Sequence, residues 1–247
     1  MKIWIQGKTL LEQFLQKRCG EKGYILSAPS DCDIAVLEYP YSNISEELAG
    51  QFDGHQKIIA GIMSKETDRF ITEKNWSIYR PLKDEIYLRE NAQMTAEGAV
   101  WAIMEKAPFA LKDARCLVIG YGRIGKALTV LLRSFGSEVI VAARRAESRQ
   151  EAGESSIPIS RIPSVIRKTD LILNTVPNRV LLENSLFSIK NTAFLFELAS
   201  KPYGFDMEQA KRLGVHASME SGLPGRYCPQ SAADALLRFI ERSVQIE

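Results

Sequence analysis

Short apolar runs alternate with amphipathic stretches along the chain, a pattern that predicts alternating strands and helices. In the first part, strands are expected over residues 2–6, 34–38 and 57–63, and helices over residues 10–19 and 64–75, with Ser64 as a helix cap. Strands separated by helices are typical of a parallel sheet, so residues 1–92 are expected to form a small α/β unit.

The second part continues the alternation. Helices are expected over residues 95–106, 126–132, 162–169, 206–213 and 231–243. Strands are expected over residues 115–119, 138–143, 171–174 and 193–198. A polar, mobile loop is expected over residues 145–158, and a rigid turn over residues 222–226. Thr95 is expected to cap its helix, and Glu97 to lie in the first turn, where the helix dipole favours an acid.

The pattern predicts two domains. Residues 95–228 are expected to form a Rossmann-type doubly wound parallel sheet, and residues 1–94 a smaller flavodoxin- or Rossmann-like α/β domain. The helix over residues 95–106 is expected to cross from the first domain to the second. The C-terminal helix over residues 229–247 is expected to pack back on the first domain.

The strongest chemical signal lies in residues 115–125, where an apolar strand ends in Gly-x-Gly-x-x-Gly and a helix follows at once. Gly120 lets the chain turn off the strand, Gly122 admits a pyrophosphate to the backbone, and Gly125 lets the helix pack on the strand. The predicted pyrophosphate site consists of Gly120, Gly122, Arg123, Ile124 and Gly125. The turn at residues 6–8 has no such fingerprint and is not expected to bind a nucleotide.

The end of the next strand distinguishes NADP from NAD. NAD sites place Asp or Glu about 20 residues after the first glycines, where the acid binds the ribose 2′-hydroxyl. Here Ala143 is followed by Arg144 and Arg145, without an acid. Because a guanidinium matches a phosphate and an acid repels it, we predict NADP as the cofactor, with NAD as the alternative. The other interpretation is that both arginines begin a solvated loop.

Composition excludes several other classes of protein. The chain has 247 residues, 45% hydrophobic and 25% charged, with a net charge of +2, so no nucleic-acid partner is expected. No apolar run approaches the roughly 18 residues of a membrane span, and the N-terminus does not resemble a signal peptide, so we expect a cytoplasmic protein. Its four cysteines are scattered and only two histidines occur, so neither disulfides nor a metal site is expected.

Two further segments follow strands, and both are expected to line a cleft at the carboxyl edge of the sheet. The segment expected beside the nicotinamide ribose is Asn174, Thr175, Val176 and Pro177. A strand that simply ends at a proline has the same pattern. Residues 197–200 occupy the corresponding place one strand further along the chain.

Together these motifs resemble the A subunits of bacterial dipicolinate synthases over roughly residues 57–240. The resemblance is carried by residues 94–99, 120–126, 142–144, 174–177, the Leu-Ala-Ser turn at 198–202 and the Leu-Pro-Gly turn at 222–225. It implies the architecture of D-2-hydroxyacid dehydrogenases, partnership with a flavoprotein-like B subunit, and the mother cell of a sporulating bacterium. The implied reaction oxidises a dihydrodipicolinate-type intermediate to dipicolinate with NAD(P). We also expect a homo-oligomer.

Such a reaction needs hydride transfer to a nicotinamide, loss of a proton and neutralisation of two carboxylates. The candidate residues are Glu197 as proton acceptor, Lys201 and Arg226 as carboxylate partners, and Thr95 and Glu97 as residues lining the cleft. Each has a structural alternative: a solvated strand end for Glu197, surface charges for the two cations, and ordinary helix capping for Thr95 and Glu97.

The chain departs from the family pattern in four places. Its first domain is shortened between residues 23 and 57, and its first turn lacks the usual second glycine. Glu197 replaces the acid of Asp-Leu-Ala-Ser, and Lys-Pro-Tyr-Gly at residues 201–204 replaces Arg-Pro-Gly-Gly. Two other functions stay open: an NADP-dependent reductase of another small hydroxyacid or cyclic imine, and a non-catalytic nucleotide-binding subunit. Neither His55 nor His216 lies in a dehydrogenase-like motif, which argues against hydroxyacid chemistry.

Overall fold

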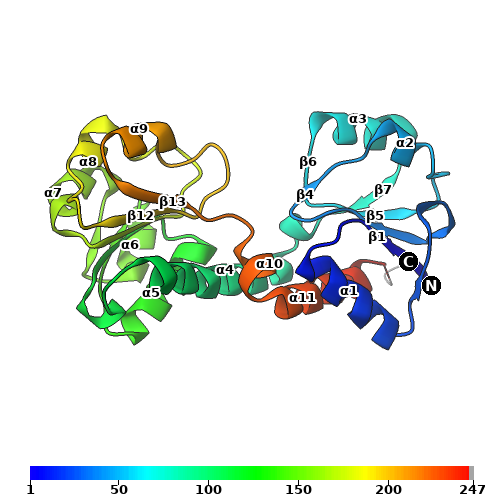
Figure 1. Ribbon diagram of the computed structural model, residues 1–247, viewed down its shortest axis with the longest axis horizontal. Coiled ribbons are helices and arrows are strands. Elements are labelled where there is room, and N and C mark those ends of the chain that lie inside the picture. Colours follow the sequence, from blue (N-terminus) through cyan, green and yellow to red (C-terminus); the bar gives the residue numbers. More distant parts are fainter. Residues whose placement is uncertain (245–247) are drawn as a thin grey trace. The chain divides into compact units, whose positions relative to one another are not determined.

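The computed structural model describes residues 1–244 and divides into two compact units. The first contains residues 1–94 and 224–244, and the second contains residues 95–223 (Figure 1). The chain passes between the units in helix α4 (Glu85–Lys106) and in helix α10 (Leu223–Tyr227). Among the described residues, every helix is too short or too polar to cross a bilayer.

A five-stranded parallel sheet with the order β2-β1-β3-β5-β7 forms the centre of the first unit. Its strands are β1 (Lys2–Ile5), β2 (Ile25–Leu26), β3 (Ile34–Val36), β5 (Lys57–Ile59) and β7 (Ser77–Tyr79), while β4 (Tyr41–Ser42) pairs separately with β6 (Ile62–Met63). The three predicted strands are confirmed, except that the last one breaks after Ile59. The break occurs where Gly61 passes so close to the Pro40 carbonyl that a Cβ would collide with it.

Helices cover both faces of this sheet (Figure 1). On one face, α1 (Leu10–Glu21) and α11 (Pro229–Val244) share an apolar core with Ile3 and Ile5 of β1. On the other face, α2 (Glu46–Ala49) and α3 (Lys65–Lys74) lie over a second core that includes Ile58 and Phe70. Residues 245–247, the end of the predicted C-terminal helix, lie outside the described residues.

Helix α3 illustrates how a local signal sets the ends of an element. The hydroxyl of Ser64 accepts the backbone N–H of Thr67 at 3.1 Å, which satisfies one of the free donors of the first turn. Asn75 ends the helix in the left-handed conformation, with φ of 52°. The predicted cap and helix are both confirmed.

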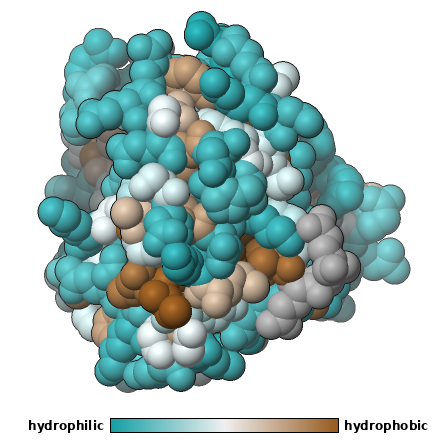
Figure 2. All heavy atoms as spheres, turned by 90° about the vertical axis from the view of Figure 1, so that its right-hand side faces the viewer, coloured by the Kyte–Doolittle hydropathy of each residue, from teal (hydrophilic) through white to brown (hydrophobic). Residues whose placement is uncertain are grey.

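The surface of the first unit is mainly polar. On the face drawn in Figure 2, hydrophilic atoms predominate and apolar atoms form small separate groups. The exposed apolar side chains of this unit include Ile25 and Leu26 of β2, which are 59% and 52% exposed at the end of the sheet. Because β2 is only two residues long, it offers little strand edge for pairing with another chain.

The second unit is built on a six-stranded parallel sheet with the order β10-β9-β8-β11-β12-β13. The strands are β8 (Arg115–Ile119), β9 (Glu138–Ala142), β10 (Ser156–Ile157), β11 (Leu171–Asn174), β12 (Phe194–Glu197) and β13 (His216–Met219). The first strand in sequence lies at the centre and the order reverses beside it, as in dinucleotide-binding sheets. The predicted Rossmann-type fold is confirmed.

Helices of the second unit lie on both faces of the sheet (Figure 1). Helices α5 (Arg123–Ser134) and α6 (Ala146–Ala152) belong to the crossovers on one side of β8. The other face carries α7 (Ile162–Val165), α8 (Glu183–Phe187) and α9 (Met207–Arg212), whose core includes Ile172 and Leu195. The buried strands β8, β11 and β12 explain why their sequences are continuous apolar runs.

The structure corrects the expected start of helix α4. This helix begins at Glu85, and Asp84 accepts the backbone N–H of Tyr87 at 2.7 Å as a cap does. Thr95 lies in the helix interior and is only 7% exposed, so the prediction that it caps the helix is wrong, and so is the placement of Glu97 in the first turn. No glycine or proline separates Asp84 from Thr95, so nothing interrupts the longer helix.

Two expected irregular segments are also ordered differently. Residues 145–158 contain helix α6 and strand β10, so the mobile loop predicted there is wrong. Residues 223–227 form the short helix α10, where a rigid turn was expected. Strand β13 was not predicted, because its four residues are only partly buried and do not form an apolar run.

Candidate functional site

The strand register of the second unit brings the predicted segments to one edge of the sheet. Ile119 lies opposite Asn174, Asn174 opposite Glu197, and Glu197 opposite Met219. On the other side, Ile119 lies opposite Ala142. All five residues end or nearly end parallel strands, so the loops that follow them emerge along this carboxyl edge, where doubly wound sheets bind ligands.

The start of helix α5 is open to an anion. Its N-cap residue is Gly122, which has no side chain to cap the helix, and the first turn holds no acid. A Cβ built on Gly122 would meet no atom within 4 Å, so a ligand can approach the backbone there. The first-turn N–H groups and the positive end of the helix dipole therefore suit a phosphate.

The start of helix α1 provides a contrast within the same chain. There Glu12 accepts the backbone N–H of Thr9 at 2.8 Å and also its hydroxyl, so a carboxylate already fills the first turn. A phosphate brought to this turn would be repelled by that charge.

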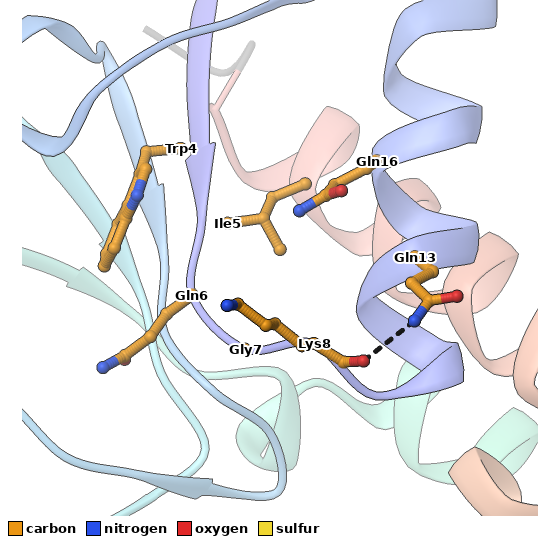
Figure 3. A pocket seen from close by; sticks show the side chains of 7 residues that line it. All are labelled: Trp4, Ile5, Gln6, Gly7, Lys8, Gln13 and Gln16. Atoms are coloured by element: carbon orange, nitrogen blue, oxygen red, sulfur yellow. Dashed lines mark hydrogen bonds between the residues drawn. The ribbon is translucent and has the colours of Figure 1, made fainter.

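A pocket with a volume of about 530 Å³ lies beside the α1 turn. Figure 3 shows its lining: Lys8 reaches toward Gln6, Gln16 points toward Ile5, and the Gln13 amide donates to the Lys8 carbonyl at 2.9 Å.

The three fingerprint glycines have distinct structural roles. Gly120 adopts a φ of +97°, and a Cβ there would collide with the Thr175 hydroxyl and contact Val176. A Cβ on Gly125 would collide with the Gly120 carbonyl, so this glycine allows the helix to pack against the turn. Thr175 holds the turn from the next strand, because its hydroxyl donates to the Ile119 carbonyl at 2.9 Å.

The turn that carries Arg144 and Arg145 is fixed by a third arginine. Arg149 of α6 donates from Nη1 to the carbonyl oxygens of Ala143 and Arg144, at 3.1 and 2.8 Å. Both Arg144 and Arg145 are exposed, at the end of the strand beside β8. The single guanidinium of Arg149 thus sets the path of the turn and leaves its two arginines open to a ligand.

Helix α6 is also connected to the fingerprint helix by an ion pair. Lys126 of α5 donates to both carboxylate oxygens of Glu151, at 2.6 and 2.7 Å. The same ammonium lies 5.5 Å from the centre of the Tyr121 ring. Both side chains of the pair are about half exposed, so the pair contributes little to stability. The Lys126 ammonium nevertheless neutralises the charge of Glu151 beside α5.

Glu197 lies in a buried network at the centre of the carboxyl edge. Its carboxylate is 1% exposed and accepts the Asn174 amide at 2.7 Å and the backbone N–H groups of Ala199 and Gly204 at 2.9 and 2.7 Å. Burial raises the pKa of Glu197, and these three donors oppose the shift. Asn174 also exchanges hydrogen bonds with the Val176 backbone, so its side chain holds both loops.

The remaining candidates lie in different environments. Lys201 is exposed in the loop held by Glu197, and makes no hydrogen bond or ion pair to the described residues. Arg226 belongs to the first unit, where its guanidinium lies 5.0 Å from the Tyr227 ring centre. In the second unit, Thr95 is buried in α4, whereas Glu97 is exposed on the same helix. The roles predicted for these residues stay predictions.

An ion pair at the same edge was not predicted from the sequence. Lys106, the last residue of α4, pairs with Glu220, which directly follows β13. The signal available was the acid in Met-Glu-Ser-Gly at residues 219–222, but it has meaning only once β13 is known to be a strand.

Comparison with known proteins agrees with this geometry. Residues 87–199 match the family model "D-isomer specific 2-hydroxyacid dehydrogenase, NAD binding domain". The A subunit of dipicolinate synthase from Bacillus subtilis is 22% identical over 225 residues, which cover 88% of this chain and 76% of that protein. The resemblance to the dipicolinate synthase A subunits is therefore confirmed.

Solved structures show the same fold. The dipicolinate synthase A subunit from Bacillus halodurans superposes with a TM-score of 0.89, at 21% identity, over 100% of this chain and 98% of that chain. A transhydrogenase from Sinorhizobium meliloti gives a TM-score of 0.73, at 13% identity, over 99% of this chain and 95% of that chain. The matched NAD-binding domain supports a nicotinamide dinucleotide cofactor and an oxidoreductase-like role.

The glycines allow a direct test of the nucleotide site. Gly122→Val should abolish NADPH binding in calorimetry, because the side chain would occupy the approach to the pyrophosphate. The melting temperature should stay unchanged, since a Cβ at this position meets open space. Gly120→Ala is the matched control for fold damage and should lower the melting temperature, because of its φ of +97° and the collision with Thr175. Normal NADPH affinity in Gly122→Val would place the nucleotide elsewhere.

The Glu197 network predicts a stability effect. All three partners of this carboxylate are donors, so Glu197→Gln places a buried N–H₂ group against another donor. The free energy of unfolding should fall by about 1–3 kcal/mol in urea titrations. Glu138→Gln, in a pair that is 58% exposed on the acid side, should change it by less than about 1 kcal/mol. Equal stability of Glu197→Gln and the unchanged protein would show that the network is not formed.

Proposed function

We propose that this chain, a relative of the dipicolinate synthase A subunits, is an NADP-dependent oxidoreductase subunit that converts a dihydrodipicolinate-type intermediate to dipicolinate. The observation that carries the proposal is the uncapped, acid-free start of α5 behind a glycine turn, with the exposed Arg144 at the end of the neighbouring strand. The similarity to the Bacillus subtilis A subunit supports the choice of substrate.

In this proposal the protein holds the cofactor at three places. The first turn of α5 and Gly122 hold the pyrophosphate, Arg144 with Arg145 holds the ribose 2′-phosphate, and residues 174–177 lie along the nicotinamide half. The free space around Gly122 and the absence of a capping carboxylate at α5 fit such a group. When bound, the oxidised nicotinamide supplies the hydride acceptor.

Oxidation of the dihydropyridine ring removes one hydride and one proton, and aromaticity favours the product. The tasks left to the protein are orienting the ring and compensating two carboxylates. Glu197 and Asn174 contribute by fixing the loops at residues 175–177 and 198–204, and Lys201 stands on the second of these loops. All three hydrogen-bond donors to the Glu197 carboxylate belong to the protein itself. For this carboxylate to accept a proton from the substrate, the loop at residues 198–204 would therefore have to open.

The experiment that tests this function is a turnover assay. Purified chain, NADP⁺ and freshly prepared dihydrodipicolinate should produce NADPH absorbance and dipicolinate, either alone or after addition of a dipicolinate synthase B subunit. Product formed only with the partner would identify the chain as a dependent A subunit. Absence of product in both mixtures, with NADPH binding intact, would contradict the enzyme assignment and favour a nucleotide-binding subunit.

Cofactor selection gives a second test. Arg144→Asp should weaken NADPH binding by about ten- to a hundred-fold, the effect of losing a charge-assisted contact of about 1.5–3 kcal/mol, while NADH binding changes much less. Arg149→Met should lower the preference by a smaller factor, because it frees the turn that carries Arg144.

The matched control is Arg161→Asp, the same charge reversal at another exposed position of this unit. It should leave both affinities unchanged. Equal affinity of the unchanged protein for NADPH and NADH would contradict the proposed NADP preference.

A further inference from the structure

The second unit contains a buried acid that no predicted role uses. The Glu220 side chain is 1% exposed, and it accepts hydrogen bonds from the ammonium of Lys106 and from the Ser218 hydroxyl, the latter at 2.6 Å. The Lys106 ammonium also donates to Ser218 at 2.8 Å. These three side chains form a closed triangle in which the acid and the cation are 114 residues apart in sequence.

The triangle lies at the carboxyl edge of the sheet. Glu220 directly follows Met219, which is in register with Glu197, and the Glu220 N–H donates to the Glu197 carbonyl at 2.9 Å. The Lys106 ammonium lies 6.0 Å from the centre of the Phe196 ring, so it stands over the end of β12.

The two partners differ in exposure. The Glu220 side chain is buried, whereas the Lys106 side chain is 35% exposed. A lysine ammonium has three N–H donors, and Lys106 uses two of them, on Glu220 and Ser218, within the described residues. A buried carboxylate thus holds a partly exposed cation that keeps a third N–H donor.

A cation whose side chain is already ordered loses less conformational entropy on binding an anionic substrate than a mobile cation does. Lys201, the cation predicted from sequence, is exposed and has no hydrogen-bond partner among the described residues, so its side chain must be ordered when the ligand binds. Lys106 is ordered by two internal acceptors before the ligand arrives.

We propose that Lys106, held by Glu220 and Ser218, binds a carboxylate of the substrate at the carboxyl edge of the second unit. This inference rests on the proposed function, since it takes the dicarboxylate substrate from there. It assigns Lys106 to substrate binding and Glu220 to positioning Lys106.

The test must separate this role from simple stabilisation. Lys106→Met alone removes the cation that faces the buried Glu220 carboxylate and is expected to destabilise the unit. The double variant Lys106→Met/Glu220→Gln removes both charges and keeps an acceptor for Ser218, so its melting temperature should stay close to that of the unchanged protein. Its affinity for dipicolinate, measured by calorimetry with NADPH present, should fall about ten- to a hundred-fold. Its NADPH affinity should change by less than about two-fold.

A second ion pair of the same unit is the matched control. Lys190 pairs with Asp170, with side chains 35% and 26% exposed, and Asp170 precedes β11 at the opposite, amino edge of the sheet. Lys190→Met/Asp170→Asn should leave dipicolinate affinity unchanged. The conservative variant Lys106→Arg, which keeps the positive charge, should bind dipicolinate more tightly than the double variant.

The outcomes separate the two levels of the proposal. If the unchanged protein binds dipicolinate and the stable Lys106→Met/Glu220→Gln variant binds it equally well, the role of Lys106 is overturned while the proposed function stands. If the unchanged protein binds NADPH but shows no affinity for dipicolinate, the proposed substrate is overturned, and the role of Lys106 falls with it.

Discussion

The N–H groups in the first turn of α5, which the N-cap residue Gly122 cannot cap with a side chain, are the constraint on which the site of the second unit depends. Helices normally satisfy these donors with a side chain, as α1 does through Glu12 and α3 through Ser64. Helix α5 starts at a glycine and has no such cap, which costs stability unless an anion supplies the acceptor. The glycine turn before it and Thr175 beside it keep this end of the helix aligned with the sheet edge.

The rest of the site follows from strand register. Because β8, β11, β12 and β13 are parallel and end in one row, the loops that follow them are brought to a single edge. Polar side chains then fix these loops. Asn174 and Glu197 bond to each other and each holds the loop that follows its own strand, while Arg149 of α6 holds the turn at Arg144. The exposed charged residues of these loops include Arg144 and Lys201, both cations.

Sequence patterns predicted the parts of this structure that local interactions determine. The fingerprint glycines, the cap at Ser64 and the apolar central strands each have a cause within a few residues. The start of α4 was misplaced, because Thr95 satisfies the local rule for a cap but lies within a longer helix that Asp84 begins. Helix α6 was read as a mobile loop, although Arg149 and Glu151 tie it to a strand end and to α5.

The pairing of Lys106 with Glu220 has no local signal, since it joins a helix end to a strand end far along the chain. For the same reason, the sequence could not show that Glu197 is enclosed by Asn174 and by the N–H groups of its own loop.

The central claim is that the open start of α5 is the cofactor site, and a crystal structure of the protein with NADPH tests it most directly. The account predicts pyrophosphate oxygens that accept N–H groups of the first turn of α5 beside Gly122, and a 2′-phosphate within hydrogen-bond reach of Arg144. Pyrophosphate bound away from this turn, for example in the pocket at Lys8 and Gln16, would contradict it.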